Sequence, residues 1–163
     1  MKFLVERDPL IDAVNWVARS LSVRPIQTSL LGIVINVDDV ITFTSSNLET
    51  TTEAVIKADI LEKGRVLVPG RLLADIARAL PDKPITFALE GTRVLVHAGS
   101  AKFQLPTLPV EEFPPLPQFP AAAGTIDSNL FAEGVSQVAI AAGKDESLVK
   151  LTGVHIEVKG KNI

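Results

Sequence analysis

Residues 68–81 read VPGRLLADIARALP and combine the end of a strand with a complete amphipathic helix. After Val68 and a Pro-Gly entry, apolar residues recur at the three- and four-residue spacing that places them on one face of a helix. Pro81 ends this helix because proline has no backbone N–H with which to continue it. The expected buried set is Leu72, Leu73, Ile76, Ala77 and Leu80, and the expected exposed set is Arg71, Asp75 and Arg78.

The same pattern occurs three times along the chain. An apolar residue at a strand end is followed by apolar residues five, nine and twelve positions later, starting at Val5, Val68 and Ile126. The repeat is about 60 residues long, and each copy is typical of a strand, a tight entry, a helix and further strands. In the first copy, Asp8 is the expected N-cap and Pro9 the first helical residue.

Short runs rich in β-branched or aromatic residues, bounded by turn signals, predict strands around these helices. The resulting fold class is α+β, with two helices packed on one side of antiparallel sheet. The predicted strands are Phe3–Val5, Ile33–Val37, Ile41–Thr44, Thr52–Ala58, Val66–Val68, Ile85–Leu89, Val94–His97, Lys102–Leu105 and, in the third copy, Val154–Lys159.

A proline-rich segment separates the second copy from the third. It holds six prolines between residues 106 and 120, which makes it too stiff and too poor in N–H donors for a central strand. We therefore expect a complete first domain over residues 1–120. Residues 121–163 are expected to be the truncated start of a second domain, because the third copy stops where the earlier copies continue with further strands.

Composition narrows the class of protein. The chain has 163 residues, of which 47% are hydrophobic and 21% charged, as in a globular domain. It has no cysteine, which excludes disulfides, thiolate metal sites and a cysteine nucleophile. No apolar run approaches the roughly 18 residues that span a bilayer, so a cytoplasmic location and no membrane contact are expected. The net charge of −3 means that any contact with DNA must come from a local patch.

Residues suited to catalysis or metal binding are few and badly placed. The histidines lack acids at ligand spacing, the paired acids lie in a turn and in the linker, and the serines lie near helix ends. No glycine-rich phosphate-binding loop is present. We therefore predict no catalytic residue, no metal and no cofactor, with a hydrolase as a distant alternative. The residues considered are His97, His155, Asp38, Asp39, Glu111, Glu112, Ser20, Ser22 and Ser128.

An ordered series of short motifs covers the whole chain. It comprises MKF at 1–3, Arg24-Pro25, SNLE at 46–49, VPGR at 68–71, IARALP at 76–81, FQLPTLP at 103–109, EFP at 112–114, AAGKD at 141–145 and LTG at 151–153. Single motifs here are weak, but their order and spacing are specific. The series resembles the bacterial sliding clamp, the beta subunit of DNA polymerase III, and corresponds to its N-terminal part.

The resemblance implies the DNA clamp fold and a function without chemistry. Clamps are rings that encircle duplex DNA and tether the replicative polymerase, so that DNA replication is processive. Each subunit has three similar domains, and two subunits join head to tail into a homodimer. The implied partners are duplex DNA, the polymerase III subunits and the clamp loader.

Phosphate contacts from flexible cations suit a clamp, because they are independent of sequence and individually weak. The resemblance places Arg24, Arg71 and Lys144 against the duplex, and the polar face of the second helix adds Arg78. The local charge agrees: the segment 65–83 carries +2, whereas the segment 38–62 carries −5. This segregation predicts that helices face DNA and that the strand region repels it.

The resemblance also implies contacts with other chains. A head-to-tail subunit contact would use Ile76, Leu80, Lys102, Phe103 and Leu105, although core packing is an alternative role for such apolar residues. Of the pocket that receives clamp-binding peptides, Leu151 is present. The alternative function is a self-associating, peptide-binding structural module that pairs through an exposed sheet edge.

Overall fold

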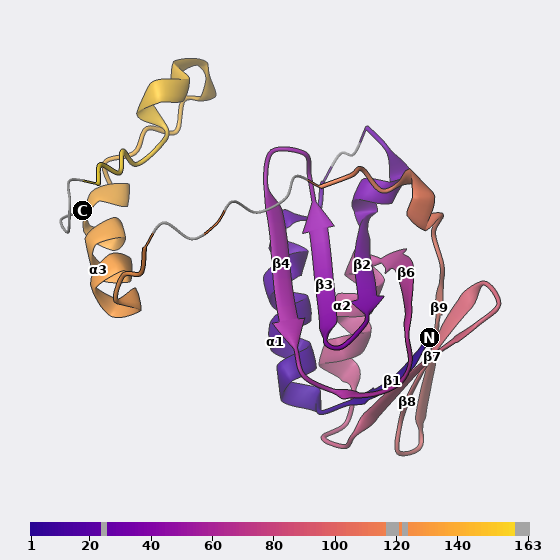
Figure 1. Ribbon diagram of the computed structural model, residues 1–163. Coiled ribbons are helices and arrows are strands. Elements are labelled where there is room, and N and C mark those ends of the chain that lie inside the picture. The colour runs from indigo at the N-terminus through magenta and orange to yellow at the C-terminus, as the bar shows by residue number, and fades with distance from the viewer. Residues whose placement is uncertain (24–25, 117–120, 122–123, 159–163) are drawn as a thin grey trace. The chain divides into compact units, whose positions relative to one another are not determined.

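Two antiparallel sheets and a pair of helices build the first of the two units of the chain, Met1–Pro117 (Figure 1). The structure, a computed structural model, describes residues 1–23, 26–116, 121 and 124–158. The elements of this unit are β1 (Lys2–Val5), α1 (Arg7–Val17), η1 (Ala18–Ser20), η2 (Thr28–Leu31), β2 (Gly32–Val37), β3 (Ile41–Ser46), β4 (Thr51–Ile56), β5 (Asp59–Glu62), β6 (Gly64–Pro69), α2 (Gly70–Ala79), β7 (Ile85–Glu90), β8 (Arg93–Ala98), β9 (Ala101–Pro106) and η3 (Val110–Glu112).

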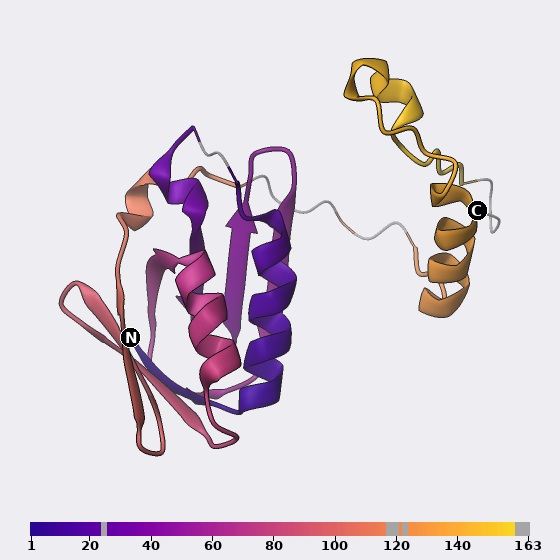
Figure 2. The same ribbon diagram turned by 180° about the vertical axis from the view of Figure 1, so that it is seen from behind.

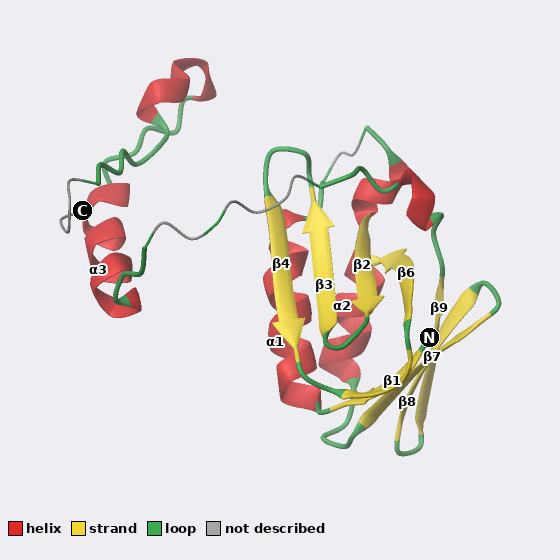
Figure 3. Ribbon diagram, viewed as in Figure 1, coloured by secondary structure: helices red, strands yellow, loops and turns green. Residues whose placement is uncertain are grey.

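The strands are shared between a five-stranded sheet and a four-stranded sheet (Figure 3). The five-stranded sheet has the order β5-β1-β7-β8-β9 and the four-stranded sheet the order β4-β3-β2-β6. Helices α1 and α2 lie side by side on one face of the four-stranded sheet (Figure 2). The predicted α+β fold, with two helices on one side of antiparallel sheet, is therefore confirmed.

One apolar core lies between the helices and the sheets. Alternate residues of β2 point into it, because successive side chains of a strand lie on opposite faces. Phe3 on β1 pairs in register with Phe87 on β7, and their rings stack with centroids 4.8 Å apart and an interplanar angle of 7°. The largest fully buried side chains are Phe3, Phe43, Phe87, Leu10, Leu30, Ile33, Ile35, Ile41, Leu67, Leu73, Ile85 and Leu105.

Helix α1 begins earlier than predicted. Its N-cap is Glu6, so Asp8 lies in the first turn and Pro9 is the third helical residue, not the first. The prolyl ring is tolerated there because the N–H groups of the first turn have no partner inside the helix. The helix ends at Val17 and continues as η1.

Helix α2 buries four of the five predicted residues, including Leu80 just beyond its end. Leu73, Ala74, Ile76 and Ala77 are buried, whereas 41% of Leu72 is exposed. The prediction that Leu72 is buried was wrong, because the contact of α2 with α1, β2 and β6 covers only one face of the helix.

The predicted strand over residues 52–58 ends two residues early, and a strand that was not predicted follows it in the other sheet. Strand β4 pairs with β3 and ends at Ile56, whereas β5 starts at Asp59 and pairs with β1. Residues 57 and 58 thus carry the chain from one sheet to the other. Strand β5 was missed because its partner, β1, lies more than 50 residues away in the sequence.

Buried hydroxyl groups from three elements close the end of α1. The carbonyl oxygen of Val17 accepts hydrogen bonds from Ser20, from Ser45 on β3 and from Thr52 on β4. The Oγ atoms of Ser20 and Ser45 are 2.6 Å apart, so these two hydroxyl groups can also bond to each other in place of one of the bonds to Val17. Because helix ends leave carbonyl groups without partners, this cluster ties the end of α1 to the four-stranded sheet.

The first part of the proline-rich segment packs on the face of the four-stranded sheet that is remote from the helices. Leu108 forms an isolated bridge with Leu67, and Phe113 is buried against Val34 and Leu67. Leu108 and Phe113 thus cover apolar side chains on the outer face of the four-stranded sheet. The first unit therefore includes residues of the predicted linker.

The second unit, Gln118–Ile163, contains α3 (Ser128–Ala139) and η4 (Glu146–Leu151). Asp127 caps α3 by accepting hydrogen bonds from the N–H groups of Asn129 and Leu130, at 2.9 and 3.0 Å. Residues 154–158 form no strand, contrary to the prediction for Val154–Lys159, and residue 159 lies outside the described residues. A strand needs a neighbouring strand to pair with, and the described residues of this unit contain no strand.

Within the described ranges, no helix combines the length and the apolar character needed to cross a membrane.

Candidate nucleic-acid interface

The sides of α1 and α2 that face away from the sheet are open to solvent (Figure 2). We call α1, η1 and α2 together the helical layer. Its charged residues all lie outside the core, because the apolar stripes of both helices are used to cover the sheet. They are the cations Arg7, Arg19, Arg71 and Arg78 and the acids Asp8, Asp12 and Asp75, which give the helical layer a net charge of +1.

The charge segregation is weaker than predicted. Of the four cations between Arg65 and Lys83, only Arg71 and Arg78 lie on a helix, whereas Arg65 is on β6 and Lys83 follows α2. Residues 32–69 hold six acids and three cations, which give a net charge of −3. The net charge of the helical layer is therefore more positive than that of this strand region, as predicted, but the difference between the two charges is smaller than predicted.

Arg71 is the second residue of α2, and its side chain is exposed. In the part of the chain that the structure describes, it makes no ion pair. The N-terminus of a helix carries unpaired N–H groups and a partial positive charge, which add to the charge of the guanidinium group. Arg71 is thus well placed to attract an anion.

Arg78 lies two turns further along α2 and is paired with Asp75. Its Nη1 atom is 3.0 Å from Asp75 Oδ1, and 59% of the arginine side chain is exposed. An exposed pair of this kind contributes about 0–1 kcal/mol. Arg78 can therefore exchange this carboxylate for another anion at little cost.

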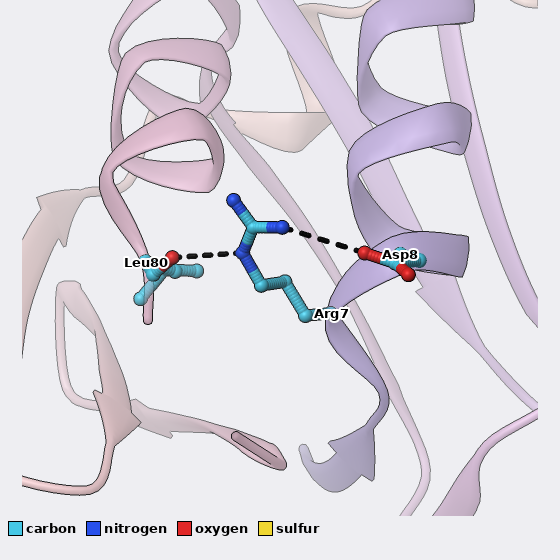
Figure 4. A network of polar contacts seen from close by, with 3 residues as sticks. All are labelled: Arg7, Asp8 and Leu80. Carbon is cyan, nitrogen blue, oxygen red and sulfur yellow. Dashed lines mark hydrogen bonds and ion pairs between the residues drawn. The ribbon is translucent and has the colours of Figure 1, made fainter. Parts of the chain in front are cut away.

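Arg7 has a structural role that the sequence did not indicate. Its Nε atom donates a hydrogen bond of 2.8 Å to the carbonyl oxygen of Leu80, just beyond α2, and its Nη1 atom is 3.4 Å from Asp8 (Figure 4). It therefore joins the start of α1 to the end of α2. The two helices run in opposite directions and are fixed relative to each other at this end.

The other end of the helical layer carries Arg19 together with Trp16. The guanidinium carbon of Arg19 lies 5.3 Å from the centre of the Trp16 ring, and 48% of Trp16 is exposed. This contact was also missed, although the spacing of three residues at the end of a helix was visible in the sequence.

Three further predicted residues cannot be assigned to the helical layer. Arg24 lies outside the described residues. Lys144 is exposed between α3 and η4, and Leu151, 62% exposed, is the last residue of η4. Both belong to the second unit, so their predicted roles in binding DNA and peptides stay predictions.

The five residues predicted for a subunit contact differ in exposure. Ile76 and Leu80 are 6% and 3% exposed, and the side chain of Leu105 is fully buried in the core. On β9, an edge strand, Lys102 is exposed and Phe103 is half-buried. The side chain of Leu105 thus has no surface for a second chain, whereas the β9 backbone, Lys102 and Phe103 do.

The acidic turn between β2 and β3 is tied to a lysine. Lys63 Nζ lies 2.5 Å from Asp38 Oδ1 and 2.8 Å from Asp39 Oδ1. The hydrogen bond from Lys63, together with its charge, lowers the pKa of Asp39. Both acids are solvent-exposed, which fits a turn and not a buried acid–base pair.

Replacing Lys63 with methionine is expected to raise the pKa of Asp39 towards its ordinary value. In the unaltered chain the lowered pKa favours the folded state above the unfolded pKa of aspartate, and this contribution is lost as the pH falls through the folded value. An NMR titration of the Asp39 carboxyl group measures the change. Lys57→Met removes a nearby exposed lysine and should leave this titration unchanged.

Among the residues that the structure describes, no three His, Cys, Asp or Glu side chains are grouped so that they could hold a metal ion. His97 on β8 and His155 in the second unit are both exposed.

Comparison with known proteins gives a consistent result. The family described as "DNA polymerase III beta subunit, N-terminal domain" matches residues 1–117. The chain is 48% identical to the beta sliding clamp of Streptomyces coelicolor over 100% of its own length and 44% of that protein. It is also 48% identical to the beta sliding clamp of Micrococcus luteus, again over its whole length and over 53% of that protein.

Solved structures agree with these matches. The DNA polymerase III subunit beta from Pseudomonas aeruginosa superposes with a TM-score of 0.85 at 27% sequence identity, over 94% of this chain and 43% of that chain. The chain thus spans about half the length of the relatives that it matches.

Proposed function

Because the chain belongs to the family of the DNA polymerase III beta subunit, N-terminal domain, we propose that it is part of a sliding clamp. In this role it contributes a wall of a ring around duplex DNA, with the helical layer towards the DNA and the sheets outside. It holds the replicative polymerase on its template and carries out no chemistry itself. The predicted resemblance to the beta subunit is confirmed by the family match.

The observation that carries this proposal is the open helical layer, whose net charge is positive relative to that of residues 32–69. A helix whose only role is to pack in the core can be covered by other elements on both of its faces. The polar faces of α1 and α2 are instead exposed to solvent. A charge of +1 is small, which suits a clamp, because strong or base-specific contacts would stop sliding. Exchangeable pairs such as Arg78 with Asp75 fit the same requirement.

The proposal extends to partners. We propose duplex DNA as the ligand of Arg24, Arg71, Arg78 and Lys144, and polymerase III subunits and a clamp loader as protein partners. A second copy joins head to tail at the β9 edge, through its backbone, Lys102 and Phe103. A protein acting on the bacterial chromosome in this way works in the cytoplasm.

Replacing Arg24 and Arg71 together with alanine is expected to weaken DNA binding about tenfold, which equals about 1.4 kcal/mol. The slope of log affinity against log salt should fall by about two, because each phosphate contact releases about one counterion. Fluorescence anisotropy of a dye-labelled duplex, measured over a series of salt concentrations, gives both quantities. Low ionic strength keeps the binding of this chain measurable.

The matched control is the double variant Arg65→Ala and Arg93→Ala. It removes the same charge from the sheets, since Arg65 lies on β6 and Arg93 on β8, and both side chains are exposed. The control should bind DNA as well as the unaltered chain does. If both double variants lost the same DNA affinity, binding would depend only on the net charge of the chain. The proposal that Arg24 and Arg71 contact DNA would then be wrong.

The exposed edge strand β9 also favours the second candidate, a self-associating module that binds peptides. DNA topology separates the two functions. A protein that closes a ring is retained on circular duplex and lost from linear duplex, whereas a peptide-binding module shows no such difference.

A further inference from the structure

The contact between Trp16 and Arg19 is unusual because it holds a cation on the surface without cancelling its charge. The guanidinium carbon lies 5.3 Å from the indole centre, within the range of a cation–π interaction. Nearly half of Trp16, 48%, is exposed, so this residue contributes less to the core than a tryptophan usually does. The exposed ring instead supports the guanidinium group of Arg19.

Two other arginines of the helical layer, Arg7 and Arg78, are held differently. Arg78 is paired with the carboxylate of Asp75, and Arg7 lies against Asp8 while it donates to Leu80. A carboxylate orients an arginine but cancels its field, whereas an aromatic ring orients it and leaves the full charge available. Arg19 makes no ion pair within the described ranges of the chain.

Arg19 lies at the same end of the helical layer as Arg71. Arg19 belongs to η1, which packs against α2, and the following Leu21 touches the start of α2 at Gly70. Arg71 is the next residue of α2 after Gly70. The three acids of the helical layer are on α1 before Trp16 or on α2 after Arg71, so both arginines stand at the end with the least negative charge.

We propose that Arg19 is a DNA-backbone contact, with Trp16 as the positioning residue that presents its guanidinium group beside Arg71. The inference rests on the proposed function, since it names a further contact of the same DNA-facing surface. The ligand is the phosphate backbone of duplex DNA and not its bases. Trp16 is the only tryptophan of the chain, and among the described residues it has no aromatic partner for a stacking platform.

A purely structural role for Arg19 would be to neutralise the negative end of α1. The structure favours contact with DNA over this structural role. The Val17 carbonyl at that end already accepts hydrogen bonds from Ser20, Ser45 and Thr52. In the part of the chain that the structure describes, the hydrogen bonds of this cluster do not involve Arg19.

The experiment combines an NMR signal of the unaltered chain with DNA-binding measurements on the unaltered chain and its variants. The single indole N–H of Trp16 gives one NMR signal, which should shift when a short duplex of mixed sequence is added at low salt. Anisotropy of a dye-labelled duplex measures the affinity and its salt dependence for every variant. Thermal unfolding of each variant checks that it is folded.

Arg19→Ala is expected to weaken DNA binding about three- to tenfold and to reduce the salt slope by about one. Trp16→Leu should weaken binding about two- to fivefold with an unchanged slope, because it removes the support and leaves the cation. Trp16→Phe should restore most of the affinity, since phenylalanine also offers a ring face. A role confined to the end of α1 would lower the unfolding temperature but would leave the slope and the indole shift unaffected.

The outcomes separate this inference from the proposed function. If Arg24 and Arg71 are needed for binding but Arg19→Ala binds like the unaltered chain, the inference is overturned and the proposed function stands. If the unaltered chain does not bind the duplex at low salt, both are overturned. If Trp16→Leu does not fold, the role of Trp16 is tested by the shift of its indole N–H signal on addition of DNA and by the DNA affinity of Trp16→Phe.

Discussion

Replacing Phe87 with alanine is expected to lower the free energy of unfolding of the first unit by about 3–5 kcal/mol. Phe87 is fully buried, and its ring stacks on Phe3 from the neighbouring strand with centroids 4.8 Å apart. The substitution removes the buried ring, leaves a cavity and breaks an aromatic pair. Because a domain of this size is stable by about 5–15 kcal/mol, the loss is a large part of the total.

Urea unfolding followed by Trp16 fluorescence measures this change, since Trp16 lies in the same unit. The midpoint should move to lower urea with little change in the slope of free energy against urea. Phe87→Leu is the matched control, and it should cost less than half as much because it keeps most of the buried apolar volume. A loss below about 1 kcal/mol for Phe87→Ala would contradict the close packing of Phe87 against Phe3.

Replacing Gly70 with valine is expected to destabilise the first unit by about 1–3 kcal/mol through overpacking. A Cβ atom at this position would lie 2.7 Å from both terminal carbons of Leu21 and 3.0 Å from Ile33 Cγ1. Leu21, α2 or both must then move. Because Arg71 follows directly, DNA affinity should fall together with stability.

The same unfolding and anisotropy measurements test this result, with Ala79→Val as the control. Ala79 is exposed on the same helix, so valine there should cost only the small difference in helix propensity, roughly 0.5 kcal/mol. Adding Leu21→Ala to Gly70→Val should make the double variant more stable than the sum of the two single effects predicts. If the two changes in unfolding free energy simply added, Leu21 would not be the side chain that requires a glycine at position 70.

These two positions show how the fold serves the proposed interface. The stacked phenylalanines hold β1 against β7, and β1 leads directly into α1. Gly70 lets η1 and α2 come close together, which brings Arg19 and Arg71 to one end of the helical layer. Arg7 fixes the opposite end through Leu80. The surface that would face DNA is thus held at both ends by contacts between distant parts of the sequence.

Part of the candidate site was visible in the sequence. The helical spacing over residues 68–81 placed Arg71 and Arg78 on the polar face of α2, and both are exposed there. The spacing did not indicate that Arg78 is paired with Asp75 whereas Arg71 is unpaired among the described residues. Nor did it identify Arg19, because its role depends on the neighbourhood of α2 and on the exposure of Trp16.

The local periods of the sequence determined which segments are helices and most of the strands, because a helical stripe or an alternating strand depends on neighbours within a few residues. The tertiary structure alone decided how these segments combine. It divided residues 51–62 between two sheets, exposed Leu72 and buried the side chain of Leu105. These outcomes depend on which distant surfaces meet, since strand pairing and burial are properties of contacts between segments and not of any segment alone.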